Sequence, residues 1–136
     1  MTMVAGLLQR RWRVVDVKIV VDGTMRLLRW RRGWLQDRLF LDEREVARVG
    51  GLFGRESVFG LVLETSGGDK RLLLTIDTTE DGWDFSGESA PRGVRLETAE
   101  ETLLAFGSLD PNRERPFLTM FENAVRAFTG EPAGGK

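Results

Sequence analysis

The chain has 136 residues, enough for one domain, and its 41% hydrophobic and 30% charged residues exclude a disordered chain. It has no Cys and no His, which excludes disulfides, thiolate metal sites, cysteine nucleophiles and imidazole acid–base chemistry. Residues 1–71 carry a net charge of +5 and residues 72–136 carry −6. Either folding interleaves these two halves, or the protein has one face that attracts anions.

The first half of the chain has the pattern of hairpin-connected strands. Residues 12–21 alternate apolar and polar side chains at a period of two, which predicts a half-buried strand. Asp22-Gly23 follows, a strong hairpin signal because both central residues of a type I′ turn need positive φ. Further strands are predicted over residues 24–32, 35–41, 45–49, 57–65 and 70–77, with a bend at glycines 50, 51 and 54 and a second hairpin loop over 66–69.

The second half predicts loops, a short strand and helices. Val94 and Leu96 indicate a seventh strand after an acidic loop over residues 78–93. Residues 98–101 fit a helix capping box, which predicts a short helix over 99–106. Pro116 suits a first helical position, and the apolar residues from 117 to 128 recur at helical spacing. The predicted fold is mainly β (α+β): an antiparallel β-sandwich or open barrel of 6–8 strands with a C-terminal amphipathic helix. It forms one domain over residues 1–130, followed by a disordered tail over 131–136.

A cluster of arginines and tryptophans surrounds the first predicted hairpin. If the Asp22-Gly23 turn forms, the strand end near Arg11 and Arg13 lies beside the segment that ends at Trp34. Arginine binds phosphate through a fixed fork of donors, and tryptophan stacks on bases or lies at membrane interfaces. The candidate anion-binding residues are Arg11, Arg13, Arg29, Trp30, Arg31, Arg32 and Trp34. The alternative is a solvated strand face whose arginine stems cover the indole rings and pair with nearby acids.

No catalytic or metal-binding pattern is found. The acidic cluster does not have the spacing of an EF-hand loop, and we expect a surface loop there; its members are Asp77, Glu80, Asp81, Asp84 and Glu88. No nucleophile accompanies a carboxylate pair, and the glycines at 50, 51 and 54 match no phosphate or dinucleotide loop. We therefore expect no enzyme activity, no metal and no cofactor.

The sequence also predicts where the protein works. No stretch approaches the ~20 apolar residues needed to span a bilayer. Residues 1–8 have no charge before their apolar run, and Gln9-Arg10-Arg11 follows it, which is the wrong order for a signal peptide. A cytoplasmic location is expected.

Three segments of the first half carry a family resemblance. They are residues 21–24 (VDGT), 38–46 (RLFLDEREV) and 52–56 (LFGRE) with Phe59. Over about residues 19–59 this resembles the repeated β-hairpin pattern of Fas apoptosis inhibitory molecule proteins. The chain departs from that pattern in having Glu43-Arg44 where a Gly-Lys turn is usual, an extra residue before Phe59, and a helical C-terminal region. The resemblance implies a non-catalytic β-sandwich that acts through protein contacts, and it supplies no functional residue. The order of strands followed by a helix also resembles the pleckstrin-homology superfold, by topology alone.

Beside an enzyme that would use carboxylates alone, two functions remain open from the sequence. The first is a non-enzymatic binding or scaffold domain that acts through protein–protein contacts or self-association, because catalytic groups are lacking and a β scaffold offers edge strands. The second is an anion-binding module that contacts phospholipid headgroups or nucleic acid through the Arg/Trp-rich hairpin, with affinity that falls as salt rises. The acidic second half argues against nucleic acid more than against a lipid surface.

Overall fold

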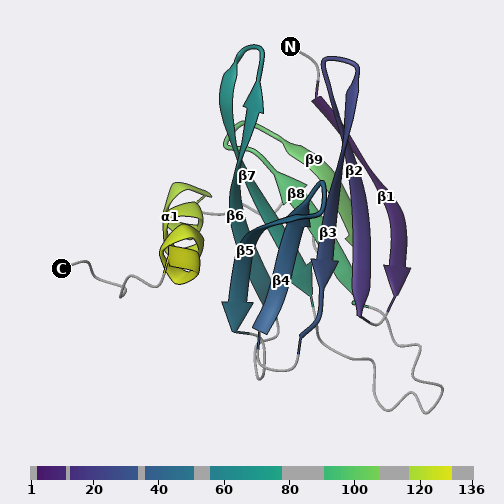
Figure 1. Cartoon of the computed structure of the whole chain (residues 1–136), viewed down its shortest axis with the longest axis vertical. Coiled ribbons are helices and arrows are strands. Elements are labelled where there is room, and N and C mark those ends of the chain that lie inside the picture. The colour runs from purple at the N-terminus through teal and green to yellow at the C-terminus, as the bar shows by residue number, and fades with distance from the viewer. Residues whose placement is uncertain are drawn as a thin grey trace.

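Nine antiparallel strands and one helix make up the computed structural model of this protein, which describes residues 3–11, 13–33, 36–50, 56–77, 91–107 and 117–129 (Figure 1). The first five strands are β1 (Met3–Arg11), β2 (Val14–Val21), β3 (Thr24–Arg31), β4 (Gln36–Leu41) and β5 (Arg44–Gly50). They are followed by β6 (Glu56–Thr65), β7 (Gly68–Asp77), β8 (Gly93–Glu97), β9 (Thr102–Gly107) and helix α1 (Phe117–Thr129).

Each half of the chain forms its own sheet, in which consecutive strands are neighbours. The order is β1-β2-β3-β4-β5 in the five-stranded sheet and β6-β7-β8-β9 in the four-stranded sheet. The two sheets lie face to face, with β5 near β6 at one seam and β1 near β9 at the other (Figure 1). Neither seam is hydrogen-bonded as a strand pair among the described residues, so the fold is a sandwich and not a closed barrel. The prediction of a mainly β sandwich with a C-terminal helix is confirmed.

The core lies between the sheets and is built from alternate residues of each strand. Val15, Val17 and Ile19 of β2 point inward, as their spacing predicts, and are almost completely buried. From the other layer, Phe59 and Leu61 of β6 pack against this cluster. The charged residues between them on β2, Asp16 and Lys18, therefore point to the outer face of the five-stranded sheet.

Two hairpin turns of the five-stranded sheet hold non-glycine residues in the left-handed region. Asp22 and Gly23 have φ of 51° and 83°, which confirms the predicted turn between β2 and β3. Asp42 and Glu43, between β4 and β5, have φ of 49° and 71°. The second turn thus has the same backbone sign pattern without a glycine, at a cost of roughly 1–2 kcal/mol per left-handed L-residue.

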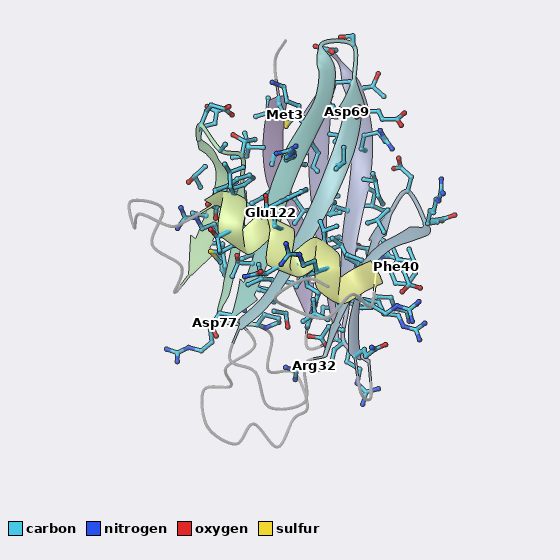
Figure 2. The ribbon with its side chains drawn as sticks, turned by 90° about the vertical axis from the view of Figure 1, so that its left-hand side faces the viewer. Met3, Arg32, Phe40, Asp69, Asp77 and Glu122 are labelled. Carbon is cyan, nitrogen blue, oxygen red and sulfur yellow. The ribbon has the colours of Figure 1, made fainter. Side chains whose placement is uncertain are left out.

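Helix α1 covers part of the outer face of the four-stranded sheet and reaches β5 at the seam (Figure 2). Phe117 and Phe121 pack on Leu73 of β7, and the two rings stack with centroids 6.0 Å apart. The helix lies close to Gly60 of β6, where a Cβ atom would stand 3.1 Å from the Phe121 ring and 3.2 Å from Val125. The predicted docking of this helix is confirmed.

Polar contacts join the two layers away from the helix. Ser57 Oγ of β6 donates a hydrogen bond of 2.9 Å to the buried Asp37 carboxylate of β4. At the β1–β9 seam, Arg10 donates to the Pro91 carbonyl and lies 4.7 Å from the centre of the Phe106 ring. Arg10 therefore stabilises the contact between the two sheets.

The predicted helix over residues 99–106 is wrong: this segment enters strand β9. The Thr98 hydroxyl does accept hydrogen bonds from the backbone N–H groups of Glu100 and Glu101, as a helix cap would. The same local bonds also close a β-turn, and here they join β8 to β9. Strand β1 is a further addition, so that the structure has nine strands where 6–8 were predicted. The expected tail over 131–136 lies outside the described residues.

Candidate anion-binding face

A row of arginines crosses the outer face of the five-stranded sheet. Strand register sets it: Val14 of β2 is paired with Arg11 of β1 and with Arg31 of β3. Arg31 is in turn paired with Arg38 of β4, and Arg38 with Arg48 of β5. The residues that follow Arg38 and precede Arg48 on their strands are buried, so these side chains face away from the core. We call Arg11, Arg31, Arg38 and Arg48 the arginine row.

The arginine row places like charges directly opposite one another. Paired residues of neighbouring antiparallel strands have Cβ atoms about 4.5–5.5 Å apart, and like charges in such pairs are destabilising. Arg11, Arg31 and Arg38 are exposed, and none of the three forms an ion pair with another residue in the described ranges. Arg48 differs, since its Nε lies 2.8 Å from Glu45 Oε1. The Arg31–Arg38 pair therefore carries repulsion that an anion placed between the two would relieve.

Arg29, next to the row on the same face, is fixed by a buried carboxylate. Its Nε and Nη2 donate to the two oxygens of Asp16 at 2.7 and 2.9 Å, and Gln9 Nε2 donates to the same carboxylate at 2.5 Å. The hydrogen bond from Arg29 lowers the pKa of Asp16 below its usual value, and the same bond raises the pKa of Arg29. A guanidinium held in this two-pronged way keeps its orientation.

A shallow hollow of about 150 Å³ opens beside the arginine row. It is lined by Leu27, Arg29 and Arg31 of β3, by Phe40 of β4 and by Glu43 of the β4–β5 turn. Phe40, labelled in Figure 2, is paired directly with Arg29. The two apolar side chains of the hollow, Leu27 and Phe40, are half-buried. The hollow thus combines an apolar floor with charges of both signs.

The predicted arginine candidates come together at one end of the sheet. Arg13 lies in the β1–β2 turn, and its carbonyl accepts a hydrogen bond of 2.9 Å from the backbone N–H of Arg32. Arg11 and Arg31 flank the same Val14, and Arg29 lies two residues before Arg31 on the same face. Register thus gathers all five arginine candidates at one end of the sheet.

Of the two tryptophan candidates, Trp30 does not join this surface as predicted. Trp30 is 1% exposed and lies in the core, because it alternates with Arg29 and Arg31 and therefore points to the opposite face. Its indole is unavailable to bases or lipid, and the guanidinium of Arg32 lies over it, 5.9 Å from the ring centre. Trp34 lies outside the described residues.

Sequence reasoning missed Arg38, Arg48 and the hollow. These depend on which strands are neighbours and in what register, which no local pattern fixes. A partial signal was present: inward Leu39 and Leu41 place Arg38 and Phe40 on the outer face of the predicted strand over 35–41.

The charges of the two halves stay apart after folding. The described residues of the five-stranded layer, 3–11, 13–33 and 36–50, include eleven Lys/Arg and six Asp/Glu, a net +5. The described residues of the four-stranded sheet and helix, 56–77, 91–107 and 117–129, include five Lys/Arg and eight Asp/Glu, a net −3. Because each half builds its own layer, the two charges are not interleaved, and the arginine row lies on the cationic layer.

The described residues form no cluster of metal ligands and no membrane-spanning helix. Among the described residues no three potential metal ligands lie together, and the predicted acidic cluster falls outside those residues except for Asp77. The described part of the chain contains no helix that is both long and apolar enough to cross a bilayer. No protein-family model, curated protein or solved structure matches the chain.

Proposed function

We propose that this protein is a non-enzymatic binding domain that contacts an anionic phospholipid surface through the arginine row and the neighbouring Arg13, Arg29 and Arg32. The observation that carries the proposal is the direct pairing of Arg31 with Arg38 on an exposed face, with no acid compensating either among the described residues. Cations arranged in this way lower the stability of the free protein, because they repel each other. Phosphate oxygens that lie between them replace this repulsion with charge-assisted hydrogen bonds.

A second feature of the same face favours lipid over nucleic acid. Val20 of β2 is paired with Val4 of β1 and Met25 of β3, and the latter two are 55% and 60% exposed. This apolar row lies at the Asp22–Gly23 end of the sheet, whereas the arginine row lies at the other end. A surface that presents apolar side chains and arginines together fits a membrane interface, where both find a partner. The phosphate backbone of a nucleic acid would match only the arginines.

The proposed setting is the cytoplasmic face of a membrane, where anionic lipids create a negative surface potential. The resemblance to Fas apoptosis inhibitory molecule proteins and the pleckstrin-homology-like topology stay predictions and are not needed for this proposal. Each arginine near such a surface contributes about 1 kcal/mol, so three together account for about a hundredfold in affinity.

Co-sedimentation with vesicles tests the proposal. The wild type should bind vesicles that contain phosphatidylserine, bind phosphatidylcholine vesicles weakly, and lose affinity as salt rises. Arg11/Arg31/Arg38→Ala should lose about a hundredfold in affinity. The control Lys18/Arg44/Lys70→Ala removes the same charge from positions outside the row and should lose much less. Equal losses in the two triple variants, or tighter binding to an oligonucleotide than to any vesicle, would contradict the proposal.

A second candidate function is contact with a protein partner or self-association through the apolar row Val4, Val20 and Met25. The observation in its favour is that Val4 of the edge strand β1 and Met25 of β3 are exposed on either side of the half-buried Val20. Sedimentation velocity over a wide concentration range distinguishes it. A dimer that Met25→Lys abolishes, and that salt does not dissociate, would favour this candidate over the lipid surface.

A further inference from the structure

The order of groups along the hollow follows from strand register. The N–H of Asp42 donates to the Leu27 carbonyl at 2.8 Å, so the turn that carries Glu43 lies beside Leu27. Successive same-face residues of a strand are about 6.5 Å apart. The hollow therefore begins with Leu27 and Glu43, continues with Arg29 opposite Phe40, and ends at Arg31. One carboxylate is followed by two guanidinium groups.

The turn that carries Glu43 and the guanidinium of Arg29 are both held in place by other residues. Asp42 accepts a hydrogen bond of 2.9 Å from the Leu27 N–H and is paired with Arg26, which fixes the β4–β5 turn against β3. Asp16 fixes the guanidinium of Arg29 through two hydrogen bonds. Groups held in this way lose little freedom when a ligand binds, which favours affinity for a ligand of matching shape.

Glu43 occupies a position where glycine would be easier. Its φ of 71° is in the left-handed region, which glycine adopts without steric cost. Strained non-glycine residues of this kind are concentrated at functional sites. In spite of this strain the chain has a carboxylate here, at the rim of the hollow and facing a region otherwise rich in arginine.

The size of the hollow limits its occupant. Its volume of about 150 Å³ corresponds to roughly five water molecules and is smaller than pockets for drug-sized ligands. Leu27 and Phe40 provide an apolar floor, the two arginines suit a phosphate, and Glu43 suits an ammonium. A simple anion would satisfy the arginines but would be repelled by Glu43.

We propose that the hollow lined by Leu27, Arg29, Arg31, Phe40 and Glu43 binds a small zwitterion in which a phosphate is joined by a two-carbon linker to an ammonium, as in phosphoethanolamine. The phosphate lies against Arg29 and Arg31, the ammonium lies near Glu43, and the linker crosses Phe40. The inference rests on the proposed function, because this zwitterion is also a phospholipid headgroup, although the free compound presents the same chemistry.

Amide chemical shifts in ¹⁵N–¹H spectra of the whole chain test this inference. Phosphoethanolamine should shift the amides of the lining residues and saturate at a concentration about fivefold below inorganic phosphate, since it adds one partly exposed ion pair. Glu43→Gln should remove that difference while phosphate binding is kept or improved. The control Glu45→Gln changes an acid of the same strand region that pairs with Arg48 and should leave the difference intact. Equal affinity for phosphoethanolamine and phosphate in the wild type, or an unchanged difference in Glu43→Gln, would overturn the inference.

Vesicles distinguish the two sources of the zwitterion and separate this inference from the proposed function. Binding to phosphatidylethanolamine vesicles that free phosphoethanolamine competes away supports the headgroup, whereas shifts with the free compound alone support a soluble ligand. Arg11/Arg38→Ala should lose binding to phosphatidylserine vesicles and keep the chemical-shift changes with phosphoethanolamine, since neither residue lines the hollow. If the wild type shows the phosphoethanolamine shifts but does not bind phosphatidylserine vesicles, only the proposed role of the arginine row is refuted. If it binds the vesicles but shows no shifts, only the proposed site in the hollow is refuted.

Discussion

The outer faces of the two sheets are used in opposite ways. On the four-stranded sheet, Gly60 and Leu73 receive helix α1, and the ion pair between Arg95 and Glu97 is buried. On the five-stranded sheet, Arg31 and Arg38 are opposed and exposed, and the apolar Met25 is left in solvent. On the first face the buried Arg95 and Glu97 pair with each other, while on the second face Arg31 and Arg38 form no ion pair among the described residues.

This difference shows where function is to be sought. A face that the chain covers with its own helix contributes to stability, and substitutions there should unfold the protein. A face with unsatisfied charge and exposed apolar side chains contributes little to stability, and substitutions there should affect binding.

The largest effect is expected at Trp30, the candidate that proved to be a core residue. Trp30→Ala should lower the free energy of unfolding by about 3–5 kcal/mol, because a large cavity is left in the sandwich. The adjacent Arg31→Ala should change it by less than about 0.5 kcal/mol. Urea unfolding followed by fluorescence or circular dichroism measures both, and equal unfolding midpoints for the two variants would refute the assignment of Trp30 to the core.

Glycines on the two outer faces provide the next comparison. Gly60→Val should cost about 1–3 kcal/mol, because the new side chain meets the Phe121 ring and Val125 under the helix. Gly6→Val on β1 is the control, since its Cβ meets only the flexible Lys18 side chain at 3.4 Å. Thermal unfolding of both variants gives the answer. A tolerated Gly60→Val would mean that the helix does not dock where the structure places it.

The Asp16–Arg29 pair should make stability depend on acid pH. Because the pKa of Asp16 is lowered in the folded state, its contribution is complete above its usual value of 3.8 and is lost as the pH falls through the folded pKa. Asp16→Asn should lose about 1–2 kcal/mol at neutral pH and show a smaller further loss on acidification than the wild type. Unfolding measured from neutral pH down to below the usual Asp pKa tests this, and parallel curves for the two proteins would count against it.

The smallest effect is expected at Arg38 and has the opposite sign. Arg38→Glu places an acid opposite Arg31 and should raise stability by about 0.2–1 kcal/mol while weakening binding to anionic vesicles. Arg38→Gln, which only removes the charge, should have a stability and a vesicle affinity between those of the wild type and Arg38→Glu. A variant that loses both stability and binding would indicate that the arginine row is part of the structural framework.

Much of the fold was predictable because local patterns agreed with the final packing. Asp22-Gly23 set a turn, and Val15, Val17 and Ile19 set the inward face of β2. Strand β1 was missed because a bulge between Leu7 and Gln9 shifts its alternation, so that apolar residues occur on both faces.

The candidate face was predicted only in part. The Asp22-Gly23 hairpin brought Arg13, Arg31 and Arg32 together as expected, since their proximity depends on one turn. Arg11 joins them through the pairing of β1 with β2. Arg38 joined them through the pairing of β3 with β4, which the sequence does not encode locally. The indole of Trp30 was assigned to the wrong environment because neither face of residues 24–32 is uniformly apolar, and only the opposing sheet decides which is buried.

The central claim, that the outer face of the five-stranded sheet is the binding face, is tested most directly by locating the contact. Amide signals of the protein should be recorded with nanodiscs of phosphatidylserine and phosphatidylcholine that carry a spin label in the headgroup region. Broadening is expected around Arg11, Arg31 and Arg38, with helix α1 unaffected. Broadening centred on α1 and β7, with the arginine row unchanged, would contradict it.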